Sequence, residues 1–321
     1  MIILVTGGAG FIGSHVVDAL LQDSRVGCVR ILDNLATGSL DNIRSAMDDP
    51  RVEFMQADIR DYAACLAACT GVHRVCHQAA LGSVPRSIAD PLTTHAVNAT
   101  GTLNIFTAAK EAAVERVVYA ASSSTYGDHP GLPKREDRTG NPLSPYAVTK
   151  LVNELYASVY ARVYGLPFIG LRYFNIFGSR QSPDGPYAAV IPLFVRSLLQ
   201  GQAPVINGDG STSRDFTYVA NAVQANLRAL FTDNPAAMNE VYNIACGEQT
   251  TLLRLFELLR AEAGTDLQPL HGPERKGDVR HSLADISKAQ SLLEYEPAVT
   301  VQEGLKRTFQ WYRDRGGKVE G

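Results

Sequence analysis

The chain has 321 residues, of which 45% are hydrophobic and 20% charged, a composition that excludes disordered and fibrous classes. Thirty Lys and Arg residues against 33 Asp and Glu residues give a formal net charge of −3, so we expect no nucleic acid as a partner. The start of the chain lacks a basic signal segment, no apolar run approaches the ~20 residues that span a bilayer, and the five cysteines lack metal-ligand spacing. We therefore expect a reduced, cytoplasmic protein without a membrane segment or a bound metal.

The first half of the chain alternates short β-branched runs with longer helical ones. The short runs predict buried strands at 2–6, 29–33, 52–56, 74–77, 116–121 and 168–172. The longer runs predict helices at 11–22, 61–68, 91–113 and 145–164. Strands and helices that alternate in this way form right-handed crossovers and a parallel sheet, so the expected fold class is α/β with a doubly wound sheet.

The pattern becomes less regular after Asn175. Residues 178–186 have the composition of a loop, and the remaining patterns predict helices at 188–200, 219–232, 252–263 and 301–313 with short strands at 204–206 and 241–244. We predict a first domain over residues 1–174 and a smaller C-terminal lobe over residues 175–321. Residues 211–245, approximately, are expected to fold back onto the first domain.

A glycine-rich turn joins the first predicted strand to the first helix. Gly7, Gly10 and Gly13 have the spacing that permits a tight turn, a close approach of backbone to a pyrophosphate and close packing of helix on strand. The start of the following helix offers N–H groups to the phosphates. Asp33 lies at the end of the second strand, where a carboxylate accepts hydrogen bonds from a ribose diol and repels a 2′-phosphate. The pattern predicts a Rossmann-type domain that binds NAD rather than NADP.

Tyr146 and Lys150 lie four residues apart at the start of the predicted helix 145–164. This spacing places the phenol and the ammonium on one helical face. A tyrosine has an ordinary pKa of ~10. To act as a base near pH 7, it requires this pKa to fall by ~3, which is equivalent to ~4 kcal/mol. Because a neighbouring cation favours the phenolate, we expect Lys150, helped by the positive nicotinamide of NAD, to lower the pKa of Tyr146, and Tyr146 to be the catalytic base.

Three serines, Ser122, Ser123 and Ser124, follow the fifth predicted strand. Ligands of open parallel sheets bind beyond the carboxyl ends of the strands, so these hydroxyls should face the cofactor. Ser122 is the best placed to bond the reacting oxygen, with Ser123 as a further catalytic candidate. One or two of the three hydroxyls could instead bond their own loop, and which serine relays the proton stays open.

These features together resemble the extended short-chain dehydrogenase/reductase superfamily and, within it, the UDP-hexose 4-epimerases. The resemblance covers nearly the whole chain and rests on residues 6–15, 58–61, 77–80, Asn98, the serine run, Tyr146 with Lys150, 171–175, 207–210, 214–216 and 277–278. It implies that NAD contacts Asp58 and Ile59 at the adenine, Ala79 and Asn98 along its path, and Tyr173 through the backbone, with Phe11, Ile12 and Asn34 as further cofactor contacts. It also implies a homodimer that forms through the helices near 91–113 and 145–164.

By the same resemblance, the second lobe binds a UDP-sugar. The implied substrate contacts are Arg214 and Arg275 at the diphosphate, Asn175 at a phosphate or sugar hydroxyl, Ala189 and Val190 at the nucleotide, Val205 and Asn207 at the uracil, Asp278 at the ribose, and Ser83, Ser123, Gln181 and Ser282 elsewhere. Taken alone, each of these arginines is an ordinary surface charge, so this set depends on the resemblance.

The implied activity is inversion at C4 of a UDP-hexose through a transient 4-keto sugar. Tyr146 takes the proton of the 4-hydroxyl with help from Ser122, while C4 gives a hydride to NAD and receives it back on its other face. Ser282 occupies the position where epimerases restricted to plain sugars often carry tyrosine. We therefore expect activity on UDP-GlcNAc and UDP-GalNAc and also on UDP-glucose and UDP-galactose.

Three alternatives remain at this point. A sugar-nucleotide 4,6-dehydratase usually carries Asp-Glu where this chain has Ser123 and Ser124. A UDP-glucuronate 4-epimerase or decarboxylase typically carries Arg in the loop where this chain has residues 181–183. A non-enzymatic NAD-binding protein tends to lose the Tyr146 and Lys150 pair, which this chain keeps.

Overall fold

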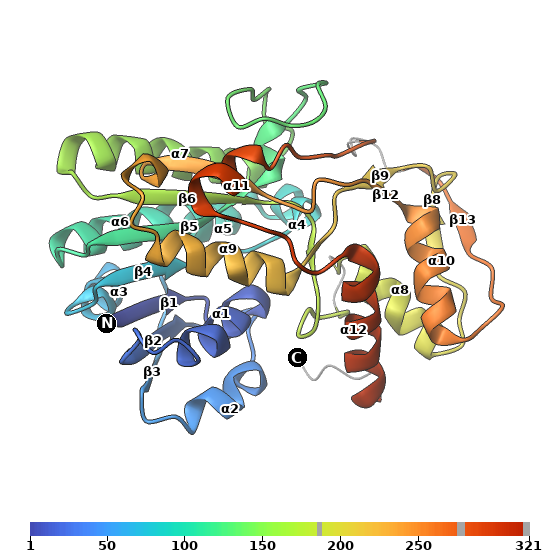
Figure 1. Cartoon of the computed structure of the whole chain (residues 1–321), viewed down its shortest axis with the longest axis horizontal. Helices are drawn as coiled ribbons and strands as arrows, with labels where there is room; N and C mark the ends of the chain where they lie inside the picture. Colours follow the sequence, from blue (N-terminus) through green and yellow to red (C-terminus); the bar gives the residue numbers. More distant parts are fainter. Residues whose placement is uncertain (185–187, 275–279, 317–321) are drawn as a thin grey trace.

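A seven-stranded parallel sheet forms the centre of the computed structural model, which describes residues 1–184, 188–274 and 280–316 (Figure 1). Its strands, in spatial order, are β3 (Val52–Gln56), β2 (Cys28–Asp33), β1 (Ile2–Thr6), β4 (Arg74–His77), β5 (Arg116–Ser122), β6 (Phe168–Tyr173) and β11 (Glu240–Ile244). Every neighbouring pair is parallel. The strand order reverses between β1 and β4, and this confirms the doubly wound sheet predicted from the sequence.

Helices cover both faces of the sheet. One face carries α1 (Phe11–Leu21) and α9 (Val219–Phe231), and the other carries α3 (Tyr62–Cys69), α6 (Thr102–Glu111) and α7 (Pro145–Tyr164) (Figure 1). Successive side chains of a strand point to opposite faces, so Ile3 and Val5 enter the core beside α1, whereas Leu4 enters the core beside α6. Covering both faces explains why these strands are continuous apolar runs.

The helix expected over 91–113 is not one regular helix. It consists of α5 (Pro91–His95), a π-helical segment over Ala96–Gly101, and α6. Inside the π-helical segment, the Thr102 hydroxyl donates to the carbonyl of Asn98 at 2.6 Å, and the Asn98 side chain bonds the backbone of Leu81. Side-chain bonds of this kind compete with the regular α-helical ladder, and π-helical turns are frequent at functional sites.

Beside the sheet, the described C-terminal residues form a smaller group of helices and short strand pairs, called the second lobe below. The helices are α8 (Val190–Leu199), α10 (Leu252–Ala263) and α12 (Val301–Asp314), and they lie together at the right of Figure 1. The pairs are β7 (Ile176–Phe177) with β10 (Thr217–Tyr218), β8 (Val205–Asn207) with β13 (Leu270–Gly272), and β9 (Ser213–Arg214) with β12 (Thr250–Thr251).

The remaining elements are short. They are the 3-10 segments Leu40–Ile43, Ser123–Tyr126 and Pro235–Ala237 and the helices α2 (Arg44–Met47), α4 (Val84–Ala89) and α11 (Ser287–Leu293). Within the described part of the chain, no helix combines the length and the apolar character needed to cross a bilayer.

Candidate active site

A cavity of about 1110 Å³ opens at the carboxyl ends of the central strands. Its walls include residues that follow directly after five strands, namely Gly7, Asn34, Gln78, Ser123 and Phe174. This is where open α/β sheets bind ligands, next to the reversal of strand order. The volume exceeds the ~300–1,000 Å³ of ordinary small-molecule pockets, so the cavity has room for a cofactor and a substrate together.

The glycine turn forms one wall of this cavity through Gly7, Gly10 and Gly13. A Cβ atom at Gly13 would lie 2.1 Å from the carbonyl oxygen of Gly7, so the turn and α1 approach each other more closely than any other residue allows. Gly10 is the N-cap of α1 and has no side chain to bond the first-turn N–H groups, while Phe11 and Ile12 line the cavity. A helix N-terminus presented in this way fits the diphosphate of NAD.

Asp33 is held rigidly at the end of β2. Its two carboxylate oxygens accept hydrogen bonds from the N–H groups of Ala9 at 2.9 Å and Leu35 at 2.8 Å. Burial raises the pKa of Asp33 above its ordinary value, and these two bonds oppose the rise. The carboxylate lines the cavity one strand away from the glycine turn, where it fits the ribose hydroxyls of NAD.

The expected adenine contacts lie beside Asp33. Asn34 donates to Asp58 at 2.8 Å, and Arg60 pairs with the same carboxylate at 2.7 Å. The hydrogen bond from Arg60 lowers the pKa of Asp58 to about 2. Asp58 and Ile59, the residues expected at the adenine, both line the cavity, as does Asn34, a further expected NAD contact.

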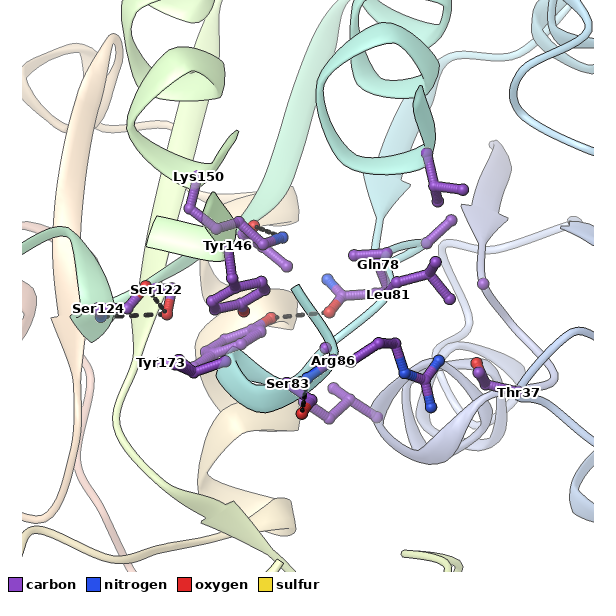
Figure 2. A pocket seen from close by; sticks show the side chains of 18 of the residues that line it. Thr37, Gln78, Leu81, Ser83, Arg86, Ser122, Ser124, Tyr146, Lys150 and Tyr173 are labelled. Atoms are coloured by element: carbon purple, nitrogen blue, oxygen red, sulfur yellow. Dashed lines mark hydrogen bonds between the residues drawn. The ribbon is translucent and has the colours of Figure 1, made fainter. Parts of the chain in front are cut away.

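Tyr146, Lys150 and Ser122 meet at the other end of the cavity (Figure 2). The Lys150 ammonium lies 5.9 Å from the centre of the Tyr146 ring and donates to the carbonyl of Ala120 at 2.8 Å. Ser122 hydrogen-bonds the phenol of Tyr146, and its own oxygen accepts from the hydroxyl of Ser124 at 2.9 Å. The helix α7 carries Tyr146 and Lys150, and Ser122 is the last residue of β5.

Burial is the largest cause of the pKa shifts at Tyr146 and Lys150. It raises the pKa of Tyr146, although the hydrogen bond with Ser122 opposes the rise, and it lowers the pKa of Lys150 to about 8. The expectation that Lys150 and the positive nicotinamide of NAD together lower the pKa of Tyr146 stays a prediction.

Tyr173 contributes its ring to the cavity, where the resemblance implied contact through its backbone only (Figure 2). Its hydroxyl donates to the side-chain carbonyl of Gln78 at 3.1 Å and accepts from Asn226 at 2.7 Å. The ring is thus fixed beside Tyr146 by one partner from the end of β4 and one from α9.

Most of the predicted site residues line this one cavity. They are Gly7, Gly10, Phe11, Ile12, Gly13, Asp33, Asn34, Asp58, Ile59, Ala79, Ser83, Ser122, Ser123, Tyr146, Lys150, Tyr173, Asn175, Arg214 and Ser282. Their individual roles stay predictions.

Six predicted residues do not line the cavity. They are Asn98, Gln181, Ala189, Val190, Val205 and Asn207. Asn98 is buried behind the wall and accepts from the N–H of Leu81 at 2.8 Å while donating to its carbonyl at 3.1 Å, so it supports the wall instead of forming it. Val205 is largely exposed on β8, away from the cavity lining. Arg275 and Asp278 lie outside the described residues.

Sequence reasoning missed Thr37, Gln78, Arg86 and Lys134, which also line the cavity. Gln78 follows directly after β4, so its position at a strand end was a signal that could have identified it. The other three lie on loops or on the short helix α4, where no spacing or motif marks them.

The chain matches the model of the NAD dependent epimerase/dehydratase family over residues 3–245. It is 40% identical to a putative UDP-glucose 4-epimerase of Methanocaldococcus jannaschii, over 97% of this chain and 98% of that protein. Two solved structures are similar over 98% of this chain. One is the UDP-glucose 4-epimerase of Thermotoga maritima with UDP-glucose (37% identity, 99% of that chain, TM-score 0.91). The other is the UDP-N-acetylglucosamine 4-epimerase of Methanobrevibacter ruminantium with UDP-N-acetylmuramic acid (39% identity, 98% of that chain, TM-score 0.92).

These matches cover most of the chain, and the cavity has the features expected of the same family. The glycine turn and Asp33 fit NAD, and Tyr146 and Lys150 lie in the same cavity. The chain belongs to the NAD-dependent epimerase/dehydratase family and is an NAD-using enzyme of the epimerase type.

Proposed function

We propose that the protein inverts C4 of UDP-linked hexoses, with UDP-GlcNAc and UDP-GalNAc as one substrate pair and UDP-glucose and UDP-galactose as another. The observation that carries the proposal is the composition of this cavity. Tyr146 and Ser122 share it with the glycine turn on one side, and with Arg214 and Ser282 from the second lobe on the other. A sugar nucleotide held by the second lobe would therefore reach the same place as the cofactor.

The chemistry follows from groups already fixed in place. When bound, NAD would supply a hydride acceptor for C4 and a positive charge that favours the phenolate together with Lys150. Tyr146 accepts the proton of the 4-hydroxyl and later returns it. Ser122 orients that hydroxyl, since its own oxygen is held by Ser124. The Lys150 ammonium, anchored on Ala120, stabilises the phenolate.

Ser282 supports a pocket wide enough for a 2-acetamido group. Its N–H donates to the carbonyl of Ser213 at 3.1 Å, and the neighbouring His281 ring bonds the Ser213 hydroxyl at 2.8 Å. The backbone at Ser282 is therefore pinned, and the size of the side chain at this position sets the width of the cavity. A serine leaves room for an acetylated sugar to turn and does not exclude the smaller plain sugar.

A UDP-glucuronate 4-epimerase is a second candidate, favoured by Lys134. This lysine is buried, and it lines the same cavity as Ser282. Its ammonium is held by the carbonyl of His129, and burial lowers its pKa. A cation at this place could receive the carboxylate of a uronate. A 4,6-dehydratase is less well supported, because Ser123 and Ser124 provide no carboxylic acid for the elimination step.

One experiment tests the assignment. The purified protein is incubated separately with UDP-GlcNAc, UDP-glucose and UDP-glucuronate, and the products are separated by chromatography. We expect 4-epimers of the first two without any added reductant. Turnover of UDP-glucuronate alone would make the uronate reading correct, and a 4-keto-6-deoxy product would identify a dehydratase.

We also propose a cytoplasmic homodimer. Four apolar side chains lie exposed along one face of α7: Val148, Leu155, Val159 and Val163. Leu92 on α5, which packs against α7, is 83% exposed. Contiguous exposed apolar residues of this kind mark protein interfaces. Light scattering coupled to gel filtration should give twice the mass of the chain, and a monomer at micromolar concentration would refute the dimer.

A further inference from the structure

Arg86 enters the cavity from α4, a helix that no sequence pattern predicted. The helix begins after Ser83, whose hydroxyl accepts the N–H of Arg86 at 3.2 Å. Figure 2 shows the guanidinium leaving α4 and extending across the cavity toward the side where Thr37 lies. Thr37 and Arg86 both line the cavity, and so does Phe11 in the first turn of α1.

The segment that carries Arg86 is braced against the rest of the domain. Asn98, buried in the π-helical turn, bonds both the N–H and the carbonyl of Leu81. Ser83 has a φ of 132°, in a region that favours glycine, and such strain persists only where the surroundings enforce the conformation. Arg86 is therefore presented from a fixed point and not from a free loop.

The cations that line the cavity in the described residues are distributed along it. Arg60 pairs with Asp58 at the expected adenine end, and Lys150 lies beside the phenol at the reactive end. Lys134 and Arg214 lie on the side of Ser282. The backbone N–H of Lys134 donates to the carbonyl of Leu283, and the guanidinium of Arg214 donates to the carbonyl of Arg280. Arg86 is the cation that extends from α4 toward the side where Thr37 lies (Figure 2). The segment of Thr37 contacts the glycine turn, because the N–H of Ser39 donates to the carbonyl of Ala9 at 3.0 Å.

A cation would add to what the start of α1 offers a diphosphate. The diphosphate carries two negative charges, whereas the helix N-terminus supplies the equivalent of about half a positive charge. The N–H groups of α1 approach the diphosphate from one side only. A guanidinium on the opposite side can bond two phosphate oxygens at once in a planar fork.

We propose that Arg86 closes over the diphosphate of bound NAD and retains the dinucleotide between turnovers. Retention suits a reaction in which the hydride returns to the sugar, because the cofactor ends each cycle unchanged. The inference rests on the use of NAD and not on the identity of the sugar.

The test compares Arg86→Ala and Arg86→Lys with the unchanged protein. Arg254→Ala is the matched control, since Arg254 is exposed on α10 and pairs with Glu257 away from the cavity. Each protein is stripped of cofactor, and its dissociation constant for NAD is measured by titration calorimetry. We expect an increase of about 10- to 100-fold for Arg86→Ala, a smaller one for Arg86→Lys, and no change for Arg254→Ala. The NAD content after purification should be lowest in Arg86→Ala, intermediate in Arg86→Lys and unchanged in Arg254→Ala.

Two results would overturn the proposal. An unchanged dissociation constant for NAD in Arg86→Ala would show that the guanidinium does not hold the dinucleotide. An unchanged constant with a raised KM for the UDP-sugar would assign Arg86 to the substrate diphosphate instead. Because the titration contains no sugar, it stays informative if none of the proposed UDP-hexoses is epimerised.

Discussion

Replacement of Gly13 by alanine tests the geometry of the dinucleotide turn most directly. The new Cβ would lie 2.1 Å from the oxygen of Gly7, 2.8 Å from its carbonyl carbon and 2.9 Å from Cα of Gly8. All three are backbone atoms, so no side chain can rotate away, and the turn has to open by roughly 1 Å to restore ordinary contacts. Overpacking of this kind costs ~1–3 kcal/mol, which lowers the melting temperature of a chain of this size by about 1.5–4.5 °C.

Gly10→Ala is the matched control for Gly13→Ala. At Gly10 the added Cβ would meet only the oxygen of Gly7, at 3.1 Å, and the backbone has an extended conformation that any residue adopts. Differential scanning calorimetry of both variants, stripped of cofactor, gives the comparison. We expect a far larger fall in the melting temperature for Gly13→Ala than for Gly10→Ala. Equal melting temperatures of the two variants, or a Gly13→Ala protein that melts like the unchanged chain, would refute the reasoning.

Three further predictions concern the reaction and the fold. Tyr146→Phe should keep the fold and the NAD but lower turnover by at least ~10²-fold in a steady-state assay; near-normal turnover would exclude Tyr146 as the base. Ser282→Tyr should lower activity on UDP-GlcNAc roughly 5- to 150-fold more than on UDP-glucose, as overpacking of a closed pocket predicts; equal losses would show that Ser282 does not set pocket size. Burial raises the pKa of Asp215 to about 7, so its contribution to stability is fully present below pH 4 and is lost as pH rises through 7. Urea unfolding from pH 4.5 to 7.5 should show that the free energy of unfolding falls as the pH rises. Asp215→Asn should reduce the slope of this free energy against pH, and an unchanged slope would assign the pH dependence to other groups.

The parts of the site that follow from sheet topology could be predicted from the sequence. Asp33 and Ser122 are the last residues of β2 and β5, and the carboxyl ends of parallel strands meet at one edge. Tyr146 and Lys150 follow from helical spacing, because α7 has the predicted bounds 145–164. Local patterns are sufficient where secondary structure alone decides the direction of a side chain.

Other features depended on contacts that local patterns do not record. Asn98 has the right residue type for a ligand contact, yet its amide is used on the backbone of Leu81. Arg86 has the pattern of a surface arginine, and only the placement of α4 over the strand ends turns it inward. The π-helical turn that interrupts the helix over 91–113 carries this same Asn98, and its partner Leu81 lies outside that helix.

The position of β11 has a consequence for how the protein is made. This strand pairs with β6, but it emerges from the ribosome only after all of residues 174–239. Until then, the edge of β6 is unpaired, and Ile169 and Leu171 lack the cover of α9, which also comes later. A fragment that stops at residue 174 should therefore aggregate rather than fold, and the nascent chain should depend on chaperones until residue 244 has been synthesised.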